Sequence, residues 1–155
     1  MALAGRKREG VERDDMRNCA GGLLVRRNEI LLAKRSPDRA FYPGVWDVVG
    51  GHCEENEVPT DALVRELEEE IGVKALAFEE IGTLEEPQPA ENGEANYHIF
   101  AVTAWTGEPR LLNAEHSELR WLSLDQALVL PLAHPRYGQL FRAVLEGRSQ
   151  PNCDI

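Results

Sequence analysis

Apolar residues occur along this chain in short runs that are rich in β-branched and aromatic side chains and are bounded by turn residues, a pattern typical of β-strands. The first two runs are joined by a short polar turn, which predicts a hairpin. A third run ends at Gly50 and Gly51, where we expect a tight loop, and turn residues between 87 and 93 predict another loop. The predicted strands are 20–25, 30–33, 45–49, 74–85, 96–105 and 119–122.

Helical spacing replaces the strand pattern in three places. Pro59 suits the first turn of a helix, apolar residues follow at intervals of three and four, and Gly72 ends the pattern. Ser123 is an expected N-cap for a helix through Leu130, and 137–146 carries an apolar stripe. Strands interleaved with helices predict a mixed sheet covered by helices on its faces, of the α/β or α+β class.

The length of 155 residues is that of one domain, and no apolar run approaches the roughly 20 residues needed to cross a bilayer. We expect a tail at 1–16, a single domain at 17–150 and a C-terminal tail at 151–155. The first residues lack the apolar core of a signal peptide. Three cysteines without a CxxC pair argue against a disulfide framework and a zinc site, so a reducing cytoplasm is the simplest compartment.

Acidic charge is concentrated in one segment. The net charge of -10 disfavours binding to a nucleic-acid backbone, and much of the excess lies in 54–70. Glu66, Glu69 and Glu70 share one helix face, where their charges repel one another and, near the C-terminus, oppose the helix dipole. A solvated surface helix would tolerate such a face, but a hard divalent cation bound to carboxylate oxygens would remove the repulsion, and Mg²⁺ fits best.

The segment from Gly51 to Val73 resembles the signature of the Nudix hydrolases. That signature is Gly, five residues, Glu, seven residues, Arg-Glu, an aliphatic residue, any residue, Glu-Glu, any residue, Gly and an aliphatic residue. The matching positions are Gly51, Glu57, Arg65, Glu66, Leu67, Glu69, Glu70, Gly72 and Val73. The resemblance, which we expect to extend from about Cys19 to Gly147, implies a Nudix-type α/β/α sandwich.

Roles for these residues follow from the resemblance. Glu66, Glu69 and Glu70 would bind Mg²⁺, with Mn²⁺ as a substitute, and the carbonyl of Gly50 is a further candidate ligand. The motif residues Gly51, Glu57, Arg65 and Gly72 would be structural, Arg65 pairing with Glu57. The implied reaction is hydrolysis of a phosphoanhydride bond in a nucleoside diphosphate-linked substrate, with water attacking phosphorus.

The general base and the substrate contacts are less closely defined. Beside Glu66 and Glu69, the resemblance assigns a catalytic role to Glu115, because a MutT-like loop glutamate stands six residues before a strand tryptophan; Glu118 is its rival. Arg35 matches a phosphate-binding arginine, although a surface cation at a strand end is an equal alternative. His134 stands near the position of a base-reading asparagine, or else packs in a loop.

Several functions remain open at this level. The pattern is nearest to the MutT-like members, which implies a nucleoside triphosphate pyrophosphohydrolase; the same machinery serves ADP-ribose, nucleotide-sugar and dinucleoside polyphosphate hydrolases, which are the alternatives. A non-catalytic nucleotide-binding module would be expected to lack one of the three helix glutamates, and none is missing here. The run 42–46 also resembles a turn of isoprenoid diphosphate isomerases. The expected partner is a small nucleotide, with neither a nucleic acid nor a membrane, and a homodimer is left open.

Overall fold

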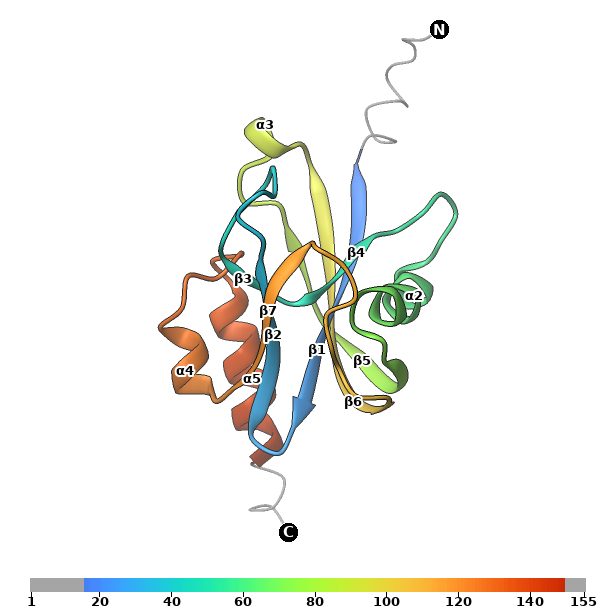
Figure 1. Ribbon diagram of the computed structural model, residues 1–155. Helices are drawn as coiled ribbons and strands as arrows, with labels where there is room; N and C mark the ends of the chain where they lie inside the picture. Colours follow the sequence, from blue (N-terminus) through green and yellow to red (C-terminus); the bar gives the residue numbers. More distant parts are fainter. Residues whose placement is uncertain (1–15, 150–155) are drawn as a thin grey trace, which may run out of the picture.

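The computed structural model describes residues 16–149, so the predicted C-terminal tail at 151–155 and all but the last residue of the predicted tail at 1–16 lie outside the described residues (Figure 1). Within that range no helix is long and apolar enough to cross a membrane. The strands are β1 (Arg17–Arg26), β2 (Glu29–Arg35), β3 (Trp46–Asp47), β4 (Val49–His52), β5 (Lys74–Glu85), β6 (Ala95–Thr106) and β7 (His116–Leu122). The helices are α2 (Pro59–Ile71), α3 (Pro89–Asn92), α4 (Leu124–Leu128) and α5 (Tyr137–Ser149).

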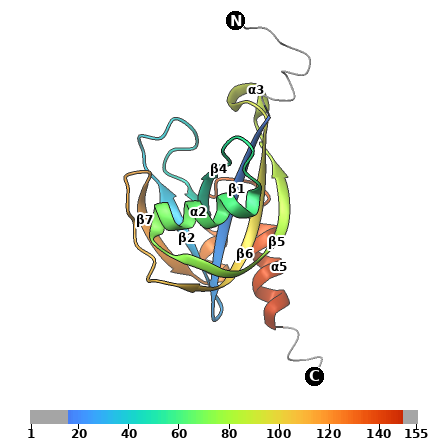
Figure 2. The same ribbon diagram turned by 90° about the vertical axis from the view of Figure 1, so that its right-hand side faces the viewer.

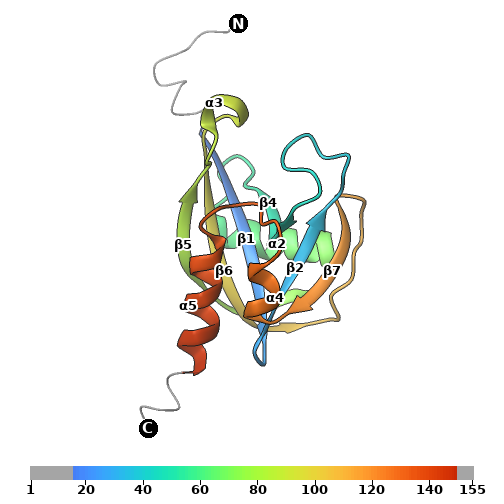
Figure 3. The same ribbon diagram turned by 90° about the vertical axis from the view of Figure 1, so that its left-hand side faces the viewer.

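Strand β1 is the centre of a mixed sheet. It runs parallel to β6 and antiparallel to β4, and β5 continues the sheet beyond β6. The predicted hairpin of β1 and β2 is confirmed, but the two strands pair only next to the turn, at Val25 with Ile30 and Arg26 with Glu29. They then diverge, and β2 pairs instead with β3 and β7 (Figure 3). This divergence opens the sheet at the end where the functional residues lie.

Side chains alternate between the two faces of the sheet, as strand geometry requires. On β1, Ala20 and Leu24 pack in the apolar cluster under α2, whereas Leu23 and Val25 pack in the cluster that contains Phe141 of α5. Helix α2 lies on one face and α5 on the other (Figure 2), and α4 lies beside α5 (Figure 1). The predicted mixed sheet between helical layers is therefore confirmed, and the architecture is an α/β/α sandwich.

Helix α2 begins and ends where the sequence predicted. Pro59 occupies the first turn, and Gly72 ends the helix in the left-handed region with φ 74°, where its N–H donates to the Glu68 carbonyl. The helix packs closely on β1, since a β-carbon added to Gly22 would lie 2.9 Å from Cδ1 of Leu63. This contact fixes the height of α2 above the sheet.

The prediction of one strand over 45–49, followed by a tight loop at the two glycines, was wrong. The run divides into β3, which pairs with β2, and β4, which pairs with β1 and contains Gly50 and Gly51. Glycine permits this approach, because a β-carbon on Gly50 would lie 1.9 Å from the carbonyl oxygen of Ala20. Smaller differences are a short helix, α3, in the predicted loop at 87–93, and α4, which ends at Leu128 rather than Leu130.

Candidate active site

A cavity of about 530 Å³ lies where β1 and β2 diverge, beneath the C-terminal half of α2. Its lining differs in chemistry between two ends. One end is acidic and comes from α2 and the loop before β7, and the other is aromatic and comes mainly from the 36–45 loop, β6 and α5. The acidic end is lined by Glu66, Glu69, Glu70 and Glu115, and the aromatic end by Phe41, Tyr42, Tyr97, His134 and Tyr137, whose tyrosine hydroxyls bond the two further carboxylates Asp47 and Glu86.

Glu66 faces the sheet from the buried side of α2, with a side chain that is 11% exposed. Its carboxylate lies directly over Gly51, where an added β-carbon would be 2.5 Å from the carboxyl carbon. Burial raises the pKa of Glu66, while Arg65 acts in the opposite direction. The glycine of β4 thus provides the space in which this buried carboxylate sits.

Glu70 lies one turn further along the same side of α2, and its side chain is 6% exposed. Its Oε1 accepts a hydrogen bond of 3.2 Å from the Asn113 amide. Burial, together with the negative charges of Glu115 and Glu66, raises the pKa of Glu70 to about 7. A carboxylate destabilised in this way would be stabilised by a cation in the cavity.

Glu69 lies at the rim of the cavity, with a side chain that is 57% exposed. The three helix glutamates are therefore brought to one region, but two are buried and one meets solvent. This difference follows from helix geometry, because Glu66 and Glu70 continue the row of Leu63 and Leu67 that packs on the sheet, whereas Glu69 is displaced from it.

Arg65 is the cation that this structure places among the carboxylates. Its guanidinium forms a bidentate pair with Glu57, at 2.9 Å from Nε and 2.8 Å from Nη2, which ties the 53–58 loop to α2. These bonds lower the pKa of Glu57 to about 2. Its Nη1 lies 3.0 Å from Glu66 and 3.3 Å from Glu69, so one guanidinium partly neutralises both helix carboxylates.

Metal binding by this end of the cavity has support from the donor set. Within residues 16–149, no three acidic, histidine or cysteine side chains converge on one point that could hold a metal ion. Glu66 and Glu69 nevertheless already share the Nη1 cation of Arg65, and the buried carboxyls of Glu66 and Glu70 have raised pKa values. An oxygen-rich, electrostatically strained set of this kind fits a hard divalent cation.

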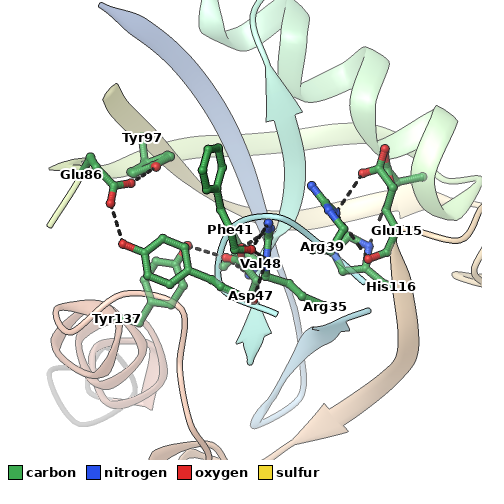
Figure 4. A network of polar contacts seen from close by, with 12 residues as sticks. Arg35, Arg39, Phe41, Asp47, Val48, Glu86, Tyr97, Glu115, His116 and Tyr137 are labelled. Carbon is green, nitrogen blue, oxygen red and sulfur yellow. Dashed lines mark hydrogen bonds and ion pairs between the residues drawn. The ribbon is translucent and has the colours of Figure 1, made fainter. Parts of the chain in front are cut away.

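Arg35 lines the cavity from the end of β2 and is held by its own loop. Nε donates to the carbonyls of Phe41 at 3.1 Å and Tyr42 at 3.0 Å, and Nη2 donates to the Phe41 carbonyl at 2.8 Å. Nη1 bonds Oδ2 of Asp47, whose Oδ1 accepts from Tyr137 at 2.6 Å (Figure 4). Since a guanidinium has five N–H donors, one on each terminal nitrogen remains for a ligand.

Arg39 and Glu115 lie side by side at the acidic end of the cavity (Figure 4). Nη1 of Arg39 lies 3.4 Å from the Glu115 carboxylate and 3.3 Å from its carbonyl oxygen, and both side chains are partly exposed. Ser36 holds the two loops together, because its N–H donates to the Glu115 carbonyl and its hydroxyl donates to the Ala114 carbonyl. Glu118, the rival of Glu115, bonds Arg120 on β7 and is not among the lining residues.

His134 lies in the aromatic end, and the backbone occupies both of its ring nitrogens. Nε2 lies 2.8 Å from the carbonyl oxygen of Glu85, and Nδ1 accepts from the N–H of Arg136 at 3.0 Å. These partners define a neutral ring with the proton on Nε2. A hydrogen bond from His134 to a nucleobase would first require one of these contacts to break.

Several lining residues were not identified from the sequence. Buried Glu86 accepts a hydrogen bond from the hydroxyl of Tyr97 (Figure 4). It also accepts from the Tyr42 hydroxyl and the Asn92 amide, so it connects the 36–45 loop, α3 and β6. No local pattern marks Glu86. Asp47 could have been identified as a candidate from the sequence, because it is a single carboxylate within the apolar strand run 45–49.

Comparison with known proteins shows the family. Residues 16–144 match the family model described as the NUDIX domain. The chain belongs to the Nudix hydrolase family. Nudix hydrolases act on small nucleotide substrates and generally use divalent metal ions.

Relatives and solved structures agree with this membership. A CTP pyrophosphohydrolase from Escherichia coli (strain K12) is 34% identical over 114 residues, which are 72% of this chain and 78% of that protein. An 8-oxo-dGTP diphosphatase from Proteus vulgaris is 31% identical over 98 residues, 63% of this chain and 85% of that protein. A crystal structure of a MutT NUDIX hydrolase from Burkholderia pseudomallei has a TM-score of 0.73 at 31% identity, covering 80% of this chain and 95% of that one. This Nudix chain is thus an enzyme with pyrophosphohydrolase relatives.

Proposed function

We propose that this Nudix hydrolase is a Mg²⁺-dependent nucleoside triphosphate pyrophosphohydrolase of the MutT-like type. The observation that carries the proposal is the division of one cavity into an acidic end and an aromatic end. A nucleotide has the same division, because its phosphates need cations and its base stacks on aromatic rings. The names of the two relatives described above support a nucleoside triphosphate as the substrate.

The acidic end would hold the ion. Glu66, Glu69 and Glu70 and the carbonyl of Gly50 are the proposed ligands, and bound Mg²⁺ would neutralise phosphate charge and lower the pKa of the attacking water. Either Glu69 at the rim or Glu115 on the opposite loop would accept the proton of that water, since both carboxylates line the cavity. Glu57 and Arg65 would hold the loop and the helix in register through their bidentate pair.

Positive charge on the chain would orient the phosphates. Arg35 retains donors on both terminal nitrogens and is proposed as one contact, held rigidly by the 41–42 carbonyls. Arg39 is the more mobile candidate, because its side chain is 31% exposed and its pair with Glu115 is long at 3.4 Å. The base would lie toward Tyr97 and Tyr137, and His134 would contact it with its ring face rather than with its nitrogens.

Release of phosphate and pyrophosphate, with and without Mg²⁺, tests the proposal. The panel should contain CTP, the other nucleoside triphosphates, oxidised guanine nucleotides, ADP-ribose, nucleotide sugars and dinucleoside polyphosphates. We expect Mg²⁺-dependent formation of a nucleoside monophosphate and pyrophosphate from a triphosphate. Preferred turnover of ADP-ribose or a nucleotide sugar would contradict the proposed substrate class, and nucleotide binding without turnover would favour a binding module.

Arg39→Gln should raise KM for the triphosphate about tenfold with little change in kcat. Loss of one phosphate contact weakens substrate binding by roughly 1.4 kcal/mol, which corresponds to a factor of ten. Steady-state kinetics would show this effect, with Arg142→Gln as the control because Arg142 is an exposed arginine of α5 that pairs with Glu146 and lies outside the cavity. An unchanged KM in Arg39→Gln would remove Arg39 from the phosphate site.

A further inference from the structure

His116 stands apart from the other buried polar residues. It is the first residue of β7, directly after Glu115, and its side chain is 4% exposed. Its Nδ1 is the one buried side-chain nitrogen or oxygen within the described range that has no hydrogen-bond partner. Buried polar atoms in native proteins are nearly always paired, so an unpaired one calls for a physical explanation.

A carboxylate oxygen lies just beyond hydrogen-bond distance of this nitrogen. Nδ1 lies 3.8 Å from Oε1 of Glu70, beyond hydrogen-bond distance but close enough for a small side-chain rotation to close the gap. A histidine donates from Nδ1 in one neutral tautomer and in the protonated form, so the contact does not require the ring to be charged. The same Oε1 already accepts a hydrogen bond from Asn113.

One side-chain donor holds the ionised form of Glu70 in this structure. Asn113 donates to it from an exposed loop, Glu66 repels it, and Glu115 can form a hydrogen bond with it only when one of the two carboxyls is protonated. A carboxylate that coordinates a metal needs a fixed orientation, which in metal sites is commonly supplied by a hydrogen bond to the oxygen that does not face the ion. His116 is placed to supply that bond from the buried strand.

We infer that His116 is a positioning residue for Glu70, whose Oε1 it binds through Nδ1–H so that the other carboxylate oxygen is presented to the divalent cation. The inference rests on the proposed function and adds to it a residue outside the motif. It gives β7 a part in metal binding through His116, next to Glu115. Strands β1 and β2 diverge at the cavity, and the contact between His116 and Glu70 connects them. His116 lies on β7, which pairs with β2, and Glu70 lies on α2, which packs on β1.

Direct titration with Mn²⁺, followed by the electron paramagnetic resonance signal of the free ion, tests this inference without relying on turnover. Asparagine places an amide nitrogen near the position of Nδ1, whereas glutamine places its amide near Nε2. We therefore expect His116→Gln to weaken Mn²⁺ binding by about 10-fold to 100-fold, and His116→Asn to restore most of the affinity. His98→Asn is the control, because His98 bonds Glu80 and Asn18 and does not line the cavity.

A second variant keeps the test valid if His116→Gln does not fold. Asn113→Ala removes the other hydrogen bond to the same oxygen from an exposed loop, and it should also weaken Mn²⁺ binding. At saturating metal the His116→Gln enzyme should recover most of its kcat. Equal losses in His116→Asn and His116→Gln, or wild-type affinity in His116→Gln or in Asn113→Ala, would overturn the inference. Absence of Mn²⁺ binding to the wild-type chain would instead contradict the proposed function itself.

Discussion

Replacement of Glu69 by glutamine is expected to lower kcat/KM by about two to three orders of magnitude. A neutral amide is a poor ligand for a hard cation and cannot accept a proton from water, and metal-assisted charge stabilisation is worth several kcal/mol at about 1.4 kcal/mol per tenfold in rate. Folding should change little, because the side chain is 57% exposed and its pair with Arg65 contributes roughly 0.5 kcal/mol. Kinetics combined with urea unfolding would separate the two effects.

Glu68→Gln is the matched control for this variant. It removes the same charge from an adjacent exposed position of α2 that does not line the cavity. Turnover in Glu69→Gln equal to that of the control would refute the assignment. If Mn²⁺ affinity is retained while kcat falls, Glu69 is the general base; if both fall together, it is a ligand and Glu115 becomes the better candidate for the base.

Gly50→Ala should destabilise the fold by about 3 kcal/mol, which is the upper part of the range for overpacking in a core. The added β-carbon would meet the Ala20 carbonyl oxygen at 1.9 Å and the Gly21 Cα at 2.7 Å, and both belong to the backbone of the central strand, which cannot rotate away. Either β4 leaves β1 or the sheet distorts. Urea unfolding measures the loss directly.

Gly147→Ala provides the contrast to this variant. A β-carbon there meets nothing within 4 Å, and the residue lies inside α5, so alanine should increase stability by up to about 1 kcal/mol. A Gly50→Ala protein as stable as the wild type would show that β4 can shift away from β1 without cost.

Local chemistry explains which parts of the molecule could be predicted from the sequence. Helix α2 was predicted with its correct ends because Pro59 and Gly72 act on their own backbone. The hairpin of β1 and β2 and the N-cap of α4 at Ser123 are equally local. The mixed sheet between helices followed from the order of these elements.

Features that depend on distant partners were missed. The run 45–51 divides into two strands because its first part pairs with β2 and its second part with β1. No residue pattern within the run predicts these different pairing partners. Glu86 gains its importance only because Tyr42 and Tyr97 reach it from 44 and 11 residues away. The roles of Arg35 and His134 remain predictions, now restricted by the backbone partners that each side chain has acquired.

The two ends of the cavity differ in how they are encoded along the chain. Most of the acidic end comes from a single stretch, since Gly50, Gly51 and the lining glutamates of α2 lie within 21 consecutive positions (50–70), whereas the aromatic end is assembled from residues as far apart as Phe41 and Tyr137. Substitutions in the dispersed segments alter the aromatic end and leave the compact stretch intact. The residues that surround the aromatic end can therefore change one segment at a time while the proposed metal ligands stay in place.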